Sequence, residues 1–195
     1  AKGQLCCGAL HSHAGHIETA KELARKNTEA FLESGCDFVI VNSAGCGAAM
    51  KEYDKLLADD PEFAERARLF SSKVKDISEY LVGQGISGPD GRVNRNVAYD
   101  APCHLIHAQR IALAPVKVLE SIPGLNLVPL RGAESCCGGA GIYNLQHPEL
   151  SAEILAEKLE SIQASGAVLS FGTDWPGTSA SEYPINPMLG LYAAV

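Results

Sequence analysis

Apolar side chains recur along the chain with two spacings, which predict helices alternating with short strands. Residues 17–34 and 148–165 carry them at steps of three and four, as in a helix with one buried face. Gly35 and Gly166 follow at the positions where helices commonly stop. The predicted buried faces are Ile17, Ala20, Leu23, Ala24, Phe31 and Leu32 in the first helix, and Leu150, Ile154, Leu155, Leu159 and Ile162 in the second.

Short apolar runs predict strands between these helices. Four strands are expected, at residues 38–41, 96–99, 126–130 and 168–171, and Pro129 indicates that the third lies at a sheet edge. Shorter helices are expected at residues 48–57, 61–74, 76–82 and 115–122. This order predicts an α/β fold with mostly parallel sheets flanked by helices.

An internal repeat divides the chain in two. Cys6-Cys7-Gly8 leads to a helix, a strand and Ala44-Gly45-Cys46, whereas Cys136-Cys137-Gly138 leads to a helix, a strand and Pro176-Gly177-Thr178. A loop with four glycines and one proline, residues 83–92, separates the copies. We therefore predict a partial first cysteine-rich repeat at 1–85, a second at 93–178 and an atypical tail at 179–195.

Composition narrows the classes of function. The net charge of −7 argues against nucleic acid and against acidic membrane surfaces as partners. The sequence contains no run of 18 apolar residues, so no membrane-spanning helix is expected. Residues 1–5 do not look like a signal peptide. Because no methionine starts the chain, we expect its numbering to begin inside a longer protein.

Seven cysteines are the chemically unusual feature. An odd count that includes two adjacent pairs suits a disulfide framework poorly. In a reducing cytoplasm, clustered thiols bind metal or take part in redox chemistry more often than they form structural disulfides. Because the sequence shows no secretory signal, the reducing cytoplasm is the expected compartment.

Six of the cysteines are predicted to gather where loops meet the ends of strands and helices. They are Cys6, Cys7, Cys46, Cys103, Cys136 and Cys137. Thiolates select iron–sulfur clusters or zinc, and glycines beside them let backbone amides approach a cluster. Buried, inert thiols are the simpler alternative. For Cys36, alone between Gly35 and a predicted strand, that simpler alternative is the prediction.

Four segments, in order, closely resemble the glycolate oxidase iron–sulfur subunit. They are Leu5–His11, Asn42–Gly47, Asp100–Leu105 and Cys136–Leu145. The wider family of Cys-Cys-Gly domains includes the cysteine-rich subunit of heterodisulfide reductase and lactate-utilisation proteins. The resemblance covers about residues 1–168.

The resemblance implies two cluster sites, one per repeat. Cys6, Cys7 and Cys46 would belong to the first site, and Cys103, Cys136 and Cys137 to the second. Gly8, Gly138 and Gly139 would supply backbone to the cluster loops. The implied cofactor is a [4Fe–4S]-type iron–sulfur cluster, which is non-cubane in some members of the family.

The resemblance also implies a role without catalysis of its own. Such a subunit passes electrons from a flavin-containing subunit that oxidises glycolate to an acceptor such as a quinone. Further implied partners are a ferredoxin-like cluster domain, absent from this chain, and, through the complex, the inner membrane as a peripheral surface.

Two departures from the family pattern concern the cluster ligands. Family members have a further cysteine upstream of the first Cys-Cys-Gly, and their second repeat closes with Asn-Pro-Gly-Cys, where this chain has Asp174–Thr178. Each site thus keeps three of its expected thiolates. Water, Asp174 or a partner chain would replace the missing ligand.

Two other interpretations stay open at this point. His11-Ser12-His13, together with Asp174 and the segment 186–195, resembles parts of metal-dependent amidohydrolases, in which a His-x-His and a late Asp bind metal. The chain would alternatively be a non-catalytic remnant that docks on a partner. His104 and His107 would either donate to cluster sulfides or bond to backbone.

Overall fold

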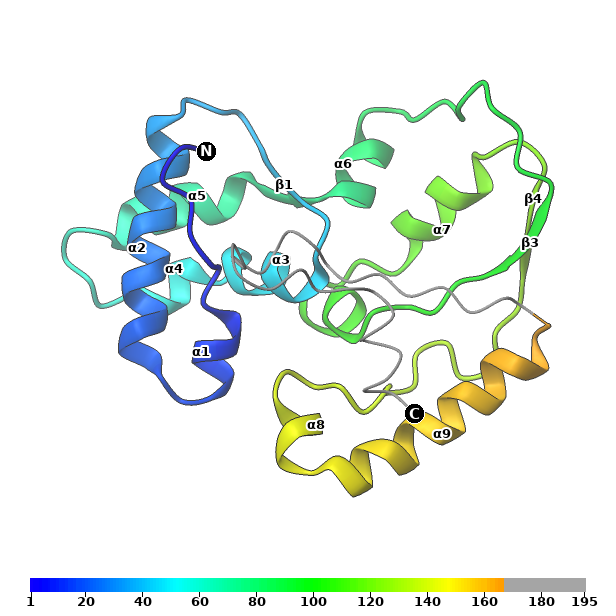
Figure 1. Ribbon diagram of the computed structural model, residues 1–195. Coiled ribbons are helices and arrows are strands. Elements are labelled where there is room, and N and C mark those ends of the chain that lie inside the picture. The colour runs from blue at the N-terminus through cyan, green and yellow to red at the C-terminus, as the bar shows by residue number, and fades with distance from the viewer. Residues whose placement is uncertain (167–195) are drawn as a thin grey trace.

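The computed structural model describes residues 1–166 (Figure 1). The predicted strand at 168–171, Asp174, the end of the second repeat and the tail at 179–195 lie outside the described residues. The elements are, in order, α1 (Ala9–His13), α2 (Ile17–Glu33), β1 (Val39–Val41), α3 (Ala44–Lys51), α4 (Tyr53–Leu56), α5 (Ala64–Lys73), β2 (Val74–Asp76), α6 (Ile77–Gly83), β3 (Arg95–Ala98), the π-helix η1 (His104–Ala108), α7 (Leu113–Glu120), β4 (Leu125–Val128), α8 (Tyr143–Gln146) and α9 (Pro148–Ala164).

Within residues 1–166 the strands form two separate parallel pairs, which confirms the predicted α/β fold. β1 pairs with β2, with Val39 opposite Val74, and β3 pairs with β4, with Arg95 opposite Leu125. Each pair is joined by a crossover that contains helices, as parallel strands require. Figure 1 shows β3 and β4 side by side, away from β1, with α7 beside them.

The core of the first half is built around two aromatic rings. Tyr53 and Phe70 are fully buried and stack with their centroids 5.3 Å apart, and Phe31 packs against Phe70 at 5.6 Å. The same cluster contains Leu57 and Val74, together with Ala24, Val39, Met50 and Ala67. It holds α2 against α4 and α5, and Cys7 of the first cysteine pair packs against it.

Two predicted helices begin elsewhere than expected. Instead of one helix at 48–57, α3 begins at Ala44 and gives way to α4 after Glu52, so Cys46 lies in the first turn of a helix and not in a loop. The helix predicted at 61–74 begins at Ala64. In the turn before α5, Asp60 accepts hydrogen bonds from the backbone amides of Glu62 and Phe63.

Strand β2 is absent from the sequence-based prediction. Its three residues carry Lys75 and Asp76, and polar residues directly before an apolar run resemble a helix start. Asp76 is both the last residue of β2 and the N-cap of α6, where it forms a capping box with Glu79. Val74 and Asp76 are both buried, which fixes the strand against the core.

The two long helices match their predicted ranges to within one residue, but polar side chains share their buried faces. In α2, Asn27 and Thr28 are buried beside Ala20 and Ala24. In α9, the buried residues are Ser151, Lys158 and Ser161, whereas Leu150, which was predicted to be buried, is 49% exposed. The buried face predicted for α9 was therefore wrong at Leu150. The side chains buried instead are polar, because they bond to backbone carbonyls.

The two halves contact one another through α3 with η1 and through α6 with α7. The predicted loop at 83–92 contains no regular element beyond the last residue of α6. No helix within residues 1–166 is long and apolar enough to cross a bilayer.

Candidate functional site

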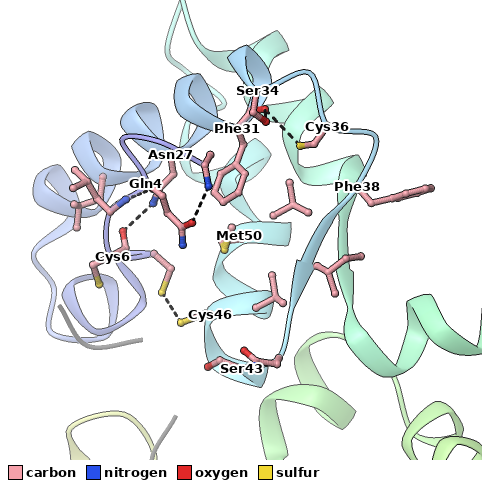
Figure 2. A pocket seen from close by; sticks show the side chains of 18 residues that line it. Gln4, Cys6, Asn27, Phe31, Ser34, Cys36, Phe38, Ser43, Cys46 and Met50 are labelled. Atoms are coloured by element: carbon pink, nitrogen blue, oxygen red, sulfur yellow. Dashed lines mark hydrogen bonds between the residues drawn. The ribbon is translucent and has the colours of Figure 1, made fainter. Parts of the chain in front are cut away.

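The first set of predicted ligands gathers at the start of α1 and the start of α3. The thiol of Cys7 lies 3.1 Å from the sulfur of Cys46, a contact drawn as a dashed line in Figure 2. Cys6 precedes it, and the amide of Gly8 donates to the Cys6 sulfur over 3.5 Å. The fold thus brings Cys46 to a cysteine pair that is far from it in sequence.

One cavity of about 990 Å³ is lined by all three of these cysteines. Its walls include residues of β1, together with Asn27 and Met50. Cys36 also lines this cavity, but Figure 2 shows it at the opposite end from Cys46, where its thiol donates to the carbonyl of Phe31 over 3.6 Å. That separation agrees with the prediction that Cys36 is no ligand, which stays a prediction.

Two buried side chains missed by sequence reasoning fix the backbone of the first cysteine pair. Asn27 accepts from the amide of Leu5 (2.8 Å) and donates to the carbonyl of Cys6 (2.9 Å). The Tyr53 hydroxyl donates to the carbonyl of Cys7 (2.8 Å) and accepts from the Asn27 amide (3.2 Å). The signal available in the sequence was a polar Asn on the otherwise apolar face of a predicted helix.

Proximity also perturbs the protonation of this set. The hydrogen bond to Cys46 raises the pKa of the Cys7 thiol well above its usual range, and burial raises it further. Burial likewise raises the pKa of Tyr53, so its hydroxyl stays a donor. The Cys7 thiol therefore keeps its proton and donates it in the hydrogen bond to the Cys46 sulfur.

The second set of predicted ligands is carried by two segments. Cys103 lies in the segment after β3, and Cys136 and Cys137 lie in the loop after β4. Burial raises the pKa of Cys103, and the proximity of Cys136 and Cys137 raises it further. The amide of Gly138 donates to the Cys136 sulfur over 3.3 Å. A Cβ atom on Gly139 would lie 3.5 Å from the Cys137 sulfur.

The two Cys-Cys-Gly triplets have the same local geometry, which agrees with the predicted repeat. Gly8 and Gly138 have φ of 80° and 84°, in the left-handed region that favours glycine. In each triplet the glycine amide points at the sulfur of the first cysteine. Each glycine also lies against a long helix, Gly8 on Ala20 of α2 and Gly138 on Ser151 of α9.

Contacts between the halves join the neighbourhoods of the two sets. The rings of His13 and His104 meet edge to face at 5.6 Å, and Gly141 lies against His13. Gln109, at the end of η1, donates to the carbonyl of Ala44 over 2.9 Å. His13 follows the first triplet and His104 follows Cys103, so these contacts bring together segments that neighbour the two cysteine sets in sequence.

The residues present suit an iron–sulfur cluster better than a single metal ion. Within residues 1–166, no three His, Cys, Asp or Glu side chains converge tightly enough to hold one ion. A cluster takes its thiolates at different iron atoms and accepts amide hydrogen bonds at sulfur. The first set offers three thiols around a roomy cavity and an amide aimed at sulfur. The assignment of all six ligands, and of Gly8, Gly138 and Gly139 as cluster-loop backbone, stays a prediction.

The histidines of α1 do not share a face. Positions two apart on an α-helix point about 200° apart, so His11 and His13 diverge. Nδ1 of His11 is buried without a hydrogen-bond partner among the described residues, whereas His13 packs against His104. A hydrolytic metal site with Asp174 stays a prediction, since Asp174 lies outside residues 1–166.

Comparison with known proteins identifies the scaffold. The sequence pattern of the cysteine-rich domain family named CCG matches residues 1–51 and 97–170. The chain belongs to this family. Both matched segments carry a Cys-Cys-Gly triplet, and the predicted resemblance is thereby confirmed.

Several curated proteins are similar to this CCG chain. The probable glycolate oxidase iron–sulfur subunit of Bacillus subtilis is 44% identical over 168 residues, which is 85% of this chain and 38% of that protein. Lactate utilization protein A of Shouchella clausii is 35% identical over 174 residues, 89% of this chain and 72% of that protein. The chain thus spans well under half of the first relative and about three quarters of the second.

Proposed function

We propose that this CCG chain is the cluster-binding part of an iron–sulfur subunit that transfers electrons during the oxidation of a 2-hydroxy acid. The observation that carries this proposal is the cavity lined by Cys6, Cys7 and Cys46, with a glycine amide directed at sulfur. The names of the relatives, a glycolate oxidase iron–sulfur subunit and lactate utilization proteins, support the substrate class.

In this proposal the chain holds, insulates and tunes the cofactor. Cys6, Cys7 and Cys46 would bind the first cluster, and Cys103, Cys136 and Cys137 the second, with iron–sulfur bonds replacing the hydrogen bond between Cys7 and Cys46. A bound cluster supplies one-electron redox chemistry. The Gly8 and Gly138 amides would stabilise the added charge of the reduced state through their hydrogen bonds to sulfur. A [4Fe–4S]-type cluster suits the cavity of about 990 Å³.

The partners follow from the same proposal. A flavin-containing subunit would remove electrons from glycolate or lactate, and the clusters held by the two cysteine sets would pass them to a quinone-type acceptor. A ferredoxin-like cluster domain would lie between the flavin and this chain. The complex would be cytoplasmic and peripheral at the inner membrane. At each site a ligand from solvent, from Asp174 or from a partner would complete the three cysteines.

Metal analysis of anaerobically prepared protein tests the proposal. We expect brown protein with iron and acid-labile sulfide in near-equal amounts. Colourless protein with one zinc per chain, lost in His11→Ala, would support the hydrolase interpretation instead. Protein that binds neither metal and folds normally in every Cys→Ser variant would support a docking remnant.

A further inference from the structure

Lys158 is a buried cation that sequence reasoning did not single out. The residue lies in α9 and is only 4% exposed. Its ammonium donates to the carbonyls of Gly132 (2.7 Å) and Ala133 (3.1 Å) and forms an ion pair with Asp100 (2.6 Å). Lysine is almost never buried without such partners, so this position is built for a positive charge.

The three acceptors belong to the two segments that deliver the second cysteine set. Asp100 comes shortly after β3 and shortly before Cys103. Gly132 and Ala133 form the turn that leads into Cys136. The carbonyl of Ala133 also accepts from the amide of Ala101 over 3.3 Å. Lys158 therefore ties together two segments whose relative position decides whether Cys103 meets Cys136 and Cys137.

The buried polar side chains of α9 all bond to the loop at residues 131–138, which carries Cys136 and Cys137. Ser161, about one turn beyond Lys158, donates to the carbonyl of Arg131, and Ser151 donates to the carbonyl of Gly138 over 2.9 Å. Carbonyls on both sides of the Cys136-Cys137 pair are thus held by side chains of one helix. This arrangement explains why the buried face of α9 is polar.

The charge of Lys158 also reaches the cysteines. A cavity of about 400 Å³ is lined by both Lys158 and Cys136, so the ammonium lies beside the cysteine pair. Among the described residues that line the first cavity there is no Lys or Arg side chain. The two cysteine sets therefore differ in electrostatic environment, although their triplets share one backbone geometry.

We propose that Lys158 is a positioning residue for the second cysteine set and that its ammonium raises the reduction potential of the cluster bound there. Reduction adds one negative charge to a cluster, and a buried cation nearby stabilises that charge more than it stabilises the oxidised state. This inference rests on the proposed function. It assigns to Lys158 an effect confined to the second of the two sites.

Two variants that change the charge of the Lys158–Asp100 ion pair in opposite directions test the proposed effect on the reduction potential. Lys158→Met keeps the apolar stem and removes the cation, whereas Asp100→Asn removes the anion that partly offsets it. We expect redox titration monitored by EPR to move one cluster potential to a more negative value in Lys158→Met and to a more positive value in Asp100→Asn. Lys51→Met, which breaks the ion pair with Glu79 in the other half, is the matched control and should leave the potential of the second cluster unchanged.

A purely structural role would move the potential in the same direction in both variants, and that result, or unchanged potentials, would overturn the electrostatic part of the proposal. Hydrogen exchange of the iron-free protein tests positioning independently. Amides of residues 131–138 should exchange faster in Lys158→Met than in the wild type or in Lys51→Met, and equal exchange would refute it. Wild-type protein without iron and sulfide would instead contradict the proposed function, while the exchange experiment would still decide the positioning role.

Discussion

The thiol of Cys7 lies 3.1 Å from the sulfur of Cys46, although 39 positions of sequence separate the two residues. Cys46 lies in the first turn of α3, where the helix dipole favours a thiolate. Two cysteine sulfurs in contact at such a position can form a disulfide as well as bind metal.

This contact predicts which disulfide forms first when iron is absent. We expect one equivalent of hydrogen peroxide to take two electrons and two protons from Cys7 and Cys46, giving their disulfide and two molecules of water. Peptide mapping of a non-reduced digest should find this bond in the wild type and in Cys36→Ser, but not in Cys46→Ser. A first disulfide within Cys6-Cys7 or Cys136-Cys137 would contradict the prediction.

Iron content should separate ligands from the remaining cysteine. We expect Cys137→Ser to lose the iron of the second site, because a neutral hydroxyl replaces a soft thiolate. Cys36→Ser should keep the wild-type iron and sulfide content, since Cys36 lies at the far end of the first cavity. Equal iron retention in both variants would remove the ligand assignment.

Gly138 should tolerate a side chain much less well than Gly166. Both have positive φ, but a Cβ atom on Gly138 would lie 2.6 Å from the Ser151 carbonyl oxygen, whereas no described atom lies within 4 Å of one on Gly166. Left-handed strain alone costs an alanine about 1–2 kcal/mol. We expect the free energy of unfolding in urea to fall by roughly that amount in Gly166→Ala and by clearly more in Gly138→Ala. Equal losses would show that the close contact with α9 is unimportant.

Asn27 should prove to be a major stabilising residue of the first cysteine pair. Asn27→Leu keeps the approximate volume of the side chain but removes hydrogen bonds to Leu5, Cys6 and Tyr53. Buried polar groups left without partners cost about 1–3 kcal/mol each, so we expect a loss of unfolding free energy of at least that size. The exposed Asn126→Ala is the control and should change stability by no more than about 0.5 kcal/mol. Similar values for the two variants would contradict the role of Asn27.

The ion pair of Arg25 with Asp60, 2.6 Å long, makes stability depend on acid pH. The hydrogen bond from Arg25 lowers the pKa of the Asp60 carboxyl, and the amides of Phe63 and Glu62 lower it further. A depressed folded-state pKa contributes stability that is fully present above the unfolded value near 4 and is lost as pH falls through the folded value. In denaturation series from about pH 6 to about pH 2, the stability difference between wild type and Asp60→Asn should therefore shrink below about pH 4. Asp59→Asn, at the exposed neighbouring position, is the control. A stability difference between the wild type and Asp60→Asn that stays constant with pH would contradict this prediction.

Periodicity and capping were sufficient to predict much of the fold. The ends of α2 and α9 follow from Gly35 and Gly166, which both adopt positive φ in the structure. The paired cysteines were recognisable because adjacent thiols in a repeated triplet have few structural uses. The family resemblance also grouped Cys46 with the first cysteine pair, and the structure places its sulfur 3.1 Å from that of Cys7. It did not reveal that Cys46 lies inside a helix.

The remaining features depend on long-range contacts that local sequence does not encode. β2 is a strand only because Val74 and Asp76 fit against the core beside β1. Lys158 resembles an exposed helical lysine until the carbonyls of Gly132 and Ala133 are seen next to its ammonium. Asn27 is comparable, since its partners come from segments far from α2 in sequence.

The contact between the two halves depends on the number of residues in the π-helix η1, which follows Cys103. In η1 the amide of Gln109 bonds to the carbonyl of His104, five residues back, so this turn contains one residue more than an α-helical turn. Deleting a single residue from 104–108 would restore ordinary winding and rotate whatever follows by about 100°. Gln109 would then lose its hydrogen bond to the carbonyl of Ala44, so the one extra residue of η1 sustains a contact between the two cysteine-bearing halves.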